Sequence, residues 1–166
     1  MKFTTQIANN LREIYFGGNW TWSCLKEHLQ DVTWQQATTQ IYSFNTIATV
    51  VYHMNYYLNA VYNVLLGEEL KGKHAESFRH PEIRCHNDWQ KMLDRTWRDA
   101  EKFARVIEEL PESLLGETFS EEKFGNYYRN INGVIEHNHY HLGQIVLMKK
   151  LLLSTVKKQR EAVMNQ

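Results

Sequence analysis

Apolar residues recur at helical spacing in four long stretches of the chain, and no stretch alternates as a surface strand would. In the first, Ile7, Leu11 and Ile14 fall on one face before Gly17 and Gly18 end the pattern. The same spacing predicts four helices, over residues 5–16, 44–66, 86–110 and 121–156. The last helix is predicted to close on cations that complement its dipole: Lys157, Lys158 and Arg160.

The connections before and after the second helix are long. The first carries a short predicted helix over residues 24–29 and a capping-box spacing at Thr33 and Gln36. It also holds three tryptophans that we expect to pack over one end of the helices: Trp20, Trp22 and Trp34. Because each amphipathic helix needs a partner, we predict a single all-α domain over residues 1–166. The expected architecture is a four-helix bundle with long loops between helices one and two and between helices two and three.

Composition supports a folded protein and indicates no polyanionic partner. The chain has 166 residues, 43% of them hydrophobic, with nineteen basic and nineteen acidic residues, so neither nucleic acid nor a membrane surface is an expected partner. Cys24 and Cys85 are far apart and form no CxxC pair, which is typical of a reducing compartment. No segment has the apolar length of a signal peptide core or a membrane span. We therefore expect a soluble cytoplasmic protein.

Three histidines alternate in "IEHNHYHLGQI", inside the fourth predicted helix. Each helical residue turns the chain by about 100°, so His141 lies about 40° from His137, whereas His139 lies about 200° away. His139 shares its sector with Glu136 and is expected to face solvent. The pattern therefore predicts that His137 and His141 point toward the core.

Two buried imidazoles one turn apart need either two hydrogen-bond partners or one shared cation. Helix two carries a third core-facing histidine, His53, opposite a sector marked by Asn45, Asn55 and Asn59. If helices two and four ran in the same direction, His53 and His137 would lie at comparable depth, and all three histidines could meet. The remaining histidines are interpreted as loop or surface residues: His28, His74, His80, His86 and His139.

Three neutral imidazoles without a thiolate suit zinc, nickel, iron, copper or manganese. Three protein ligands leave positions open, as catalytic metal sites do. Gln144, one turn beyond His141, and Tyr57, one turn beyond His53, are candidates for supporting the site or facing a substrate, and Asn130 is a weaker one. For Tyr57 an ordinary core role is the competing interpretation.

Three segments carry a resemblance to a known family. "YYRNINGVIEHNHYHLGQIVLMKKLL", with "VVYHMNYYLNAV" and "DVTWQQA" upstream, resembles the DinB/YfiT-like superfamily of bacterial helical metalloproteins. The most specific part is the HxxxHxxQI-type helix, here His137, His141, Gln144 and Ile145, paired with His53 on the second helix. The resemblance extends over nearly the whole chain.

This resemblance implies a four-helix bundle, often a homodimer, with a divalent metal on His53, His137 and His141 at the floor of a cleft. Zinc and nickel are the metals that it favours. Characterised members of the superfamily attach thiols such as bacillithiol or mycothiol to electrophiles, and one is a mycothiol-dependent maleylpyruvate isomerase. By this analogy the metal would bind a thiol and lower its pKa, and the partner would be a small molecule.

Two other interpretations remain open at this stage: a metal-dependent hydrolase, and a non-catalytic protein that binds a metal or ligand. A buried general base would favour an enzyme. The sequence offers none that can be placed beside the histidines, because Glu136 faces outward and Asp88 lies at the start of helix three. Catalysis is therefore inferred from the resemblance alone.

Overall fold

The computed structural model describes the backbone of residues 1–164 and the side chains of residues 1–154. Among these residues the only β-type pairing is an isolated bridge between Thr118 and Asn126. The prediction of an all-α protein is confirmed.

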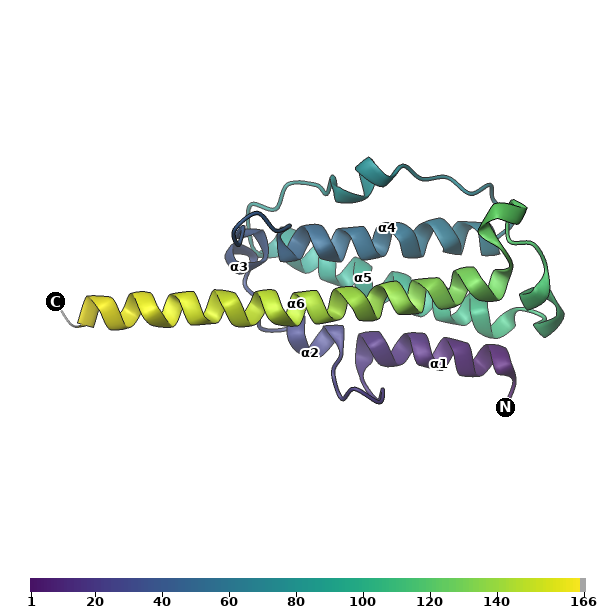
Figure 1. Ribbon diagram of the computed structural model, residues 1–166, viewed down its shortest axis with the longest axis horizontal. Coiled ribbons are helices and arrows are strands. Elements are labelled where there is room, and N and C mark those ends of the chain that lie inside the picture. Colours follow the sequence, from purple (N-terminus) through teal and green to yellow (C-terminus); the bar gives the residue numbers. More distant parts are fainter. Residues whose placement is uncertain (165–166) are drawn as a thin grey trace.

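Four long helices pack around one apolar core. They are α1 (Phe3–Phe16), α4 (Ile47–Leu65), α5 (His86–Glu109) and α6 (Tyr127–Met164). In Figure 1, α1 and α6 run in one direction and α4 and α5 in the other. Helices α1 and α4 each pack against both α5 and α6. Each apolar face predicted from the sequence is thereby covered by two neighbours.

Local signals explain where α4 and α6 begin. The Thr46 side chain accepts a hydrogen bond from the Thr49 N–H, so α4 begins at residue 47 rather than 44. Gly125 has a φ of 74° and separates a short 3-10 helix, η3 (Glu122–Phe124), from α6. Helix α6 therefore begins six residues later than predicted, and it continues to Met164. The cations expected to close it lie outside the described side chains: Lys157, Lys158 and Arg160.

The first long connection contains the short helices α2 (Leu25–Leu29) and α3 (Trp34–Thr38). The predicted capping box is present at the start of α3, where Thr33 and Gln36 bond each other's backbone N–H. The expectation for the tryptophans is wrong in two of three cases. Trp34 packs against the core, whereas Trp20 and Trp22 are 95% and 92% exposed on the loop after α1.

The second long connection, residues 66–85, crosses the outer side of α4 (Figure 1). We call it the strap. It contains the 3-10 helix η1 (His74–Phe78), which packs against α4. After α5, a further 3-10 helix, η2 (Glu112–Gly116), leads toward α6. The strap contributes to the candidate site described below, because it brings side chains from outside the long helices onto the face of α4.

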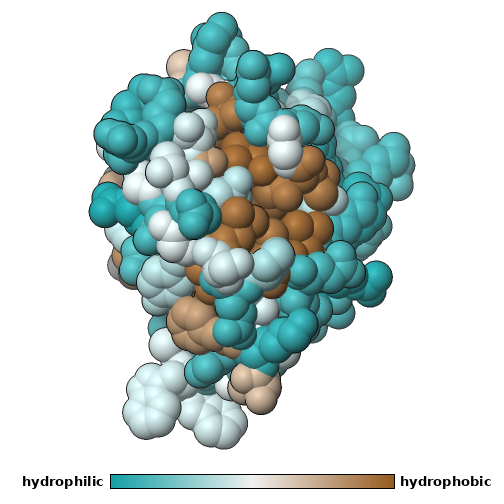
Figure 2. Space-filling model, turned by 90° about the vertical axis from the view of Figure 1, so that its right-hand side faces the viewer, coloured by the Kyte–Doolittle hydropathy of each residue, from teal (hydrophilic) through white to brown (hydrophobic). Residues whose placement is uncertain are grey.

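Apolar side chains also reach the surface at one end of the molecule. Figure 2 looks onto this end, where α4 and α5 finish and α6 begins, and shows a group of apolar side chains there. Phe3 and Leu66 are exposed. No helix among the described residues is both long and apolar enough to cross a membrane.

A buried polar contact joins the first and last helices. The Asn138 side chain is fully buried on α6 and donates a hydrogen bond of 2.9 Å to the Tyr15 hydroxyl on α1. Burial raises the pKa of Tyr15, so this hydroxyl stays protonated at neutral pH. Because Asn138 directly follows His137, this contact orients α6 next to that histidine.

Replacing Tyr15 by phenylalanine should lower the free energy of unfolding by about 1–3 kcal/mol, because the buried Asn138 amide then loses its hydrogen-bond acceptor. Urea denaturation measures this change. The matched control is Tyr42→Phe, at a side chain that is 84% exposed, and it should leave stability unchanged. Equal stability of Tyr15→Phe and the wild type would contradict this account.

Candidate metal centre

Helices α4 and α6 bring three histidines together. His53 lies twelve residues before the end of α4, and His137 lies ten residues after the start of α6. The two helices are antiparallel neighbours (Figure 1), so these nearly equal distances place both histidines at the same level. The condition stated above, that the two helices run in the same direction, is not met, yet the three side chains meet.

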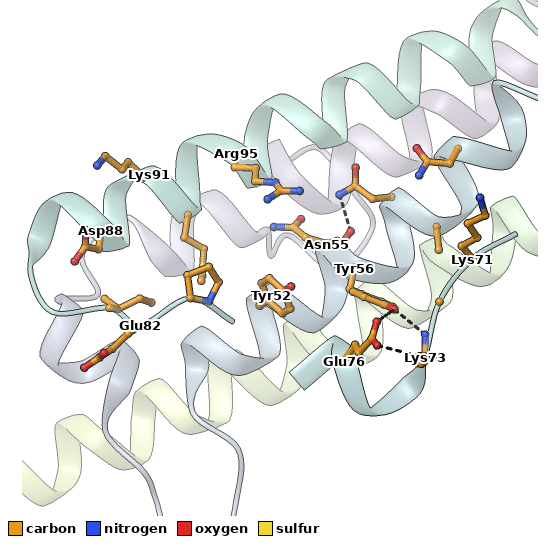
Figure 3. Close-up of a pocket in the computed structure, with 17 residues that line it drawn as sticks. Tyr52, Asn55, Tyr56, Lys71, Lys73, Glu76, Glu82, Asp88, Lys91 and Arg95 are labelled. Carbon is orange, nitrogen blue, oxygen red and sulfur yellow. Dashed lines mark hydrogen bonds and ion pairs between the residues drawn. The ribbon is translucent and has the colours of Figure 1, made fainter. Parts of the chain in front are cut away.

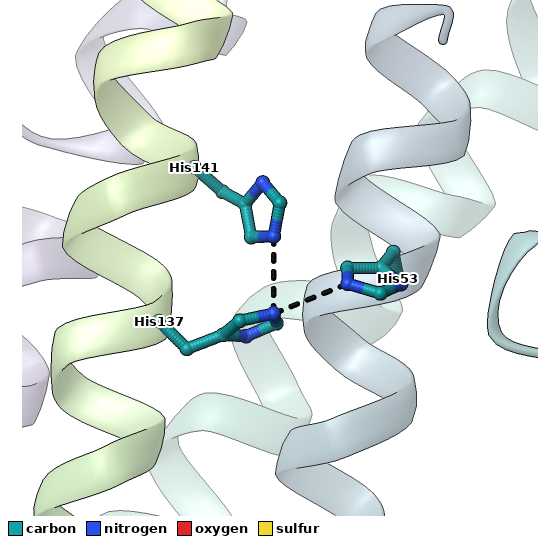
Figure 4. A group of neighbouring side chains, drawn as sticks. All are labelled: His53, His137 and His141. Carbon is teal, nitrogen blue, oxygen red and sulfur yellow. Dashed lines mark hydrogen bonds between the residues drawn. The ribbon is translucent and has the colours of Figure 1, made fainter. Parts of the chain in front are cut away.

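The three imidazoles turn the same ring nitrogen toward one point (Figure 4). The Nε2 atom of His137 lies 3.1 Å from that of His53 and 3.0 Å from that of His141. All three ligand atoms lie within 4.8 Å of one another. His53 and His141 are buried, and His137 is half-buried. This group could hold a metal ion, since neutral imidazoles are common ligands of divalent metals.

The tautomer of His53 follows from counting hydrogens. Its Nδ1 atom is 2.8 Å from the Ser77 hydroxyl, which donates its single hydrogen to the His74 carbonyl at 2.7 Å. Ser77 must therefore accept a hydrogen bond from the Nδ1–H of His53. The Nε2 atom of His53 then carries a lone pair, which is directed at the other two rings.

His141 is fixed by a similar contact. Its Nδ1 atom is 2.7 Å from the side-chain oxygen of Gln144, whose amide nitrogen donates to the Tyr140 hydroxyl at 2.9 Å. Nδ1 of His141 is therefore the protonated nitrogen, and Nε2 is free to bind a cation. Among the described residues, the buried Nδ1 atom of His137 has no hydrogen-bond partner.

Burial keeps all three rings neutral. It lowers the pKa of His53 and of His137 to about 4, with a further contribution from the neighbouring histidines. Burial also lowers the pKa of His141, and the hydrogen bond to Gln144 opposes that shift. At neutral pH the centre therefore presents lone pairs and no positive charge. Its residues fit a divalent cation.

Aromatic side chains and the strap enclose one side of the centre. Phe78 stacks on His53 with ring centroids 4.3 Å apart. Tyr57 packs edge-on against His53 and His137, and its hydroxyl is 2.9 Å from Nδ1 of His74. Tyr57 thus contacts two of the candidate ligands, and His74, interpreted from sequence as an ordinary loop residue, lies beside them.

A pocket of about 440 Å³ opens next to His53 and His141. Its walls are mainly apolar and come from the connection before α4, from α4, the strap and α6: Phe44, Val50, Phe78, Leu147, Met148 and Leu151. Among the residues whose side chains the structure describes, none that lines this pocket is acidic, lysine or arginine. Glu136 is exposed and bonds Asn132, and Asp88 lies elsewhere, so neither supplies a base to this pocket.

The remaining sequence candidates are placed differently. Asn130 donates to the carbonyls of Phe124 and Asn126 near the start of α6, so it supports the helix start and not the histidines. His139 is half-buried rather than solvated and lies outside the three-histidine group. Asn55, expected to face solvent, is buried against α5.

Sequence reasoning missed Ser77 and Phe78. Both lie in a polar connection that has no helical periodicity, and Ser77 is fully buried. The one available signal is a single aromatic residue, Phe78, in the otherwise polar stretch "HAESFRH".

No family model, curated protein or solved structure matches this chain in the comparisons made with each. The relation to the DinB/YfiT-like superfamily thus stays a prediction from the motif.

Replacing Ser77 by alanine should weaken metal binding by about 10- to 100-fold, because His53 then loses the acceptor that fixes its tautomer. The affinity for Zn²⁺ can be measured by competition with a chromophoric chelator. Ser113→Ala, at an exposed site after α5, is the control. An unchanged affinity in Ser77→Ala would show that this hydrogen bond does not orient a ligand.

In the metal-free protein, stability should fall as the pH is lowered from about 6.5 to about 4. An unfolded histidine binds its proton near pH 6.5, whereas folded His53 and His137 do so only near pH 4. The unfolded state therefore binds more protons in this interval, and acid favours it. Urea midpoints at several pH values measure the slope, with His86→Ala as an exposed control. A slope unaffected by His53→Ala would contradict the assignment.

Proposed function

We propose that this protein is a divalent-metal-dependent enzyme of the DinB/YfiT-like type, with a four-helix-bundle fold, that transfers a low-molecular-weight thiol to an electrophile. The observation that carries the proposal is the convergence of the Nε2 atoms of His53, His137 and His141 beside an apolar pocket. Zinc and nickel are the proposed metals, with iron or manganese as alternatives, because the ligand set is all imidazole.

The pocket lining favours thiol transfer over hydrolysis. Hydrolysis commonly uses a carboxylate or a similar group to move protons between water and the leaving group. No carboxylate lines this pocket within residues 1–154, and the histidines that reach it belong to the proposed metal centre. A thiol needs only to lose its proton to become a strong nucleophile. Apolar walls also suit an organic electrophile better than a charged polymer.

Each part of the chain has a separate task in this proposal. The three histidines bind the ion, Ser77 and Gln144 orient two of them, and Phe78 shields His53 from water. A divalent ion held in this way supplies a Lewis acid that lowers the pKa of a bound thiol. In the net reaction the thiol sulfur bonds to the electrophilic carbon, the leaving group departs with its electron pair, and the thiol proton passes to solvent.

Removing any one of the ligands should reduce bound metal to well below one ion per chain. His53→Ala, His137→Ala and His141→Ala are the test variants, and His139→Ala, two residues from both ligands of α6, is the matched control. Elemental analysis of purified protein gives the stoichiometry. Full metal content in all three ligand variants would refute the centre, and loss in His139→Ala would show a general structural effect.

The reaction is tested separately, by following the consumption of bacillithiol, mycothiol and glutathione with the electrophile monochlorobimane. We expect metal-dependent turnover with at least one thiol, lost on chelation and in His137→Ala. If metal binds but no thiol is consumed, the transferase proposal fails and a non-catalytic metal- or ligand-binding role replaces it.

The proposed homodimer rests on the resemblance, and the proposed cytoplasmic location rests on composition. The mass of the protein in solution tests the homodimer.

A further inference from the structure

A second and larger pocket lies on another face of α4. It has a volume of about 600 Å³, within the range of small-molecule sites. Its walls come from α4, from α5 and from the strap (Figure 3). None of the three metal-centre histidines lines it. The turn η1 separates the two sites, since Lys73 and Glu76 face this pocket while Ser77 bonds His53.

The floor of this pocket contains an unpartnered buried acceptor. Asn55 is only 6% exposed, and its amide nitrogen donates to the Thr96 hydroxyl at 2.5 Å. Thr96 donates its own hydrogen to the Met92 carbonyl, so it must accept from Asn55 and the orientation of the amide is fixed. The Asn55 oxygen has no partner among the described residues. A ligand that fills this pocket can supply the missing N–H or O–H donor.

The wall formed by α5 carries excess positive charge. Lys91 and Arg95 lie one turn apart and both line the pocket. Two like charges at this spacing lower the stability of an isolated helix. Arg95 bonds Asp99 through Nε alone, so its two terminal nitrogens stay available. Lys91 forms no ion pair among the described residues. On the strap, Lys71 is only weakly paired, with Glu69 at 3.8 Å.

The carboxylates of the lining offset these cations in part. Glu82 pairs with Arg84 at 2.6 Å, and Glu76 with Lys73 at 3.6 Å. Asp88 stays ionised one turn before Lys91, because hydrogen bonds from the Arg84 backbone N–H and the Cys85 thiol, together with the charge of Lys91, lower its pKa. The lining holds four basic side chains and three carboxylates, so its formal charge is +1.

We propose that this pocket binds a small organic anion, a carboxylate or a phosphate, that also bears a hydrogen-bond donor. The anionic group would lie against Lys91 and Arg95, the donor would reach the oxygen of Asn55, and the remaining part would pack on Tyr52 and Ile83. This site is distinct from the metal centre and does not depend on the function proposed for it.

The test is NMR titration of the full chain with two probes, N-acetyl-L-glutamate for the carboxylate class and glycerol 3-phosphate for the phosphate class. We expect saturable shifts of the backbone amides of Gly72 and Ile83 with at least one probe. The neutral counterparts, N-acetylglutamate dimethyl ester and glycerol, should cause none. Glutarate, an anion without an N–H donor, should bind more weakly than N-acetylglutamate.

Lys91→Gln changes an exposed side chain and should weaken the binding of the active probe by about tenfold, the effect of one lost charged hydrogen bond. The matched control, Lys102→Gln, is exposed on the same helix outside the pocket and should bind normally. The proposal is overturned if neither anion gives saturable shifts, if the neutral ester binds equally well, or if Lys91→Gln and Lys102→Gln bind alike. If glutarate binds as tightly as N-acetylglutamate, the Asn55 oxygen accepts no hydrogen bond from the ligand, and that part of the proposal is overturned.

Discussion

Three imidazole nitrogens that face one another at 3.0 and 3.1 Å impose the strongest constraint on this protein. Hydrogen bonds at Nδ1 keep the Nε2 lone pairs of His53 and His141 directed toward the other rings. Burial lowers the pKa of His53 and His137, so these rings stay unprotonated at neutral pH. A divalent cation satisfies all three at once. Helices α4 and α6 supply these rings, and the strap fixes one of them through Ser77.

The strap contacts both the candidate metal centre and the larger pocket. On one side of η1, Ser77 and Phe78 contact His53, and on the other, Lys73 and Glu76 line the larger pocket. One short turn therefore supports a ligand of the metal centre and forms a wall of a separate site. The described lining of the first site is mainly apolar and has no lysine, arginine or carboxylate, whereas the second has four basic side chains and three carboxylates, so the two suit different molecules.

Helical periodicity predicted the all-α class, and the 100° turn per residue separated His139 from the other two histidines of α6. Periodicity could not predict the relative direction of two helices, because parallel and antiparallel neighbours give the same amphipathic pattern. Nor could it place Ser77, whose burial depends on how the strap folds back. Asn55 was misplaced because its amide nitrogen donates to Thr96 on another helix, a contact that no local pattern encodes.

X-ray absorption spectroscopy of the zinc-loaded protein tests the central claim most directly. We predict imidazole nitrogens at about 2.0–2.1 Å from the metal, three of them from the chain, and no sulfur at about 2.3 Å. The imidazole contribution should decrease in His53→Ala, since that ligand comes from a separate helix. A sulfur scatterer, or a spectrum unchanged by His53→Ala, would contradict a centre built from His53, His137 and His141.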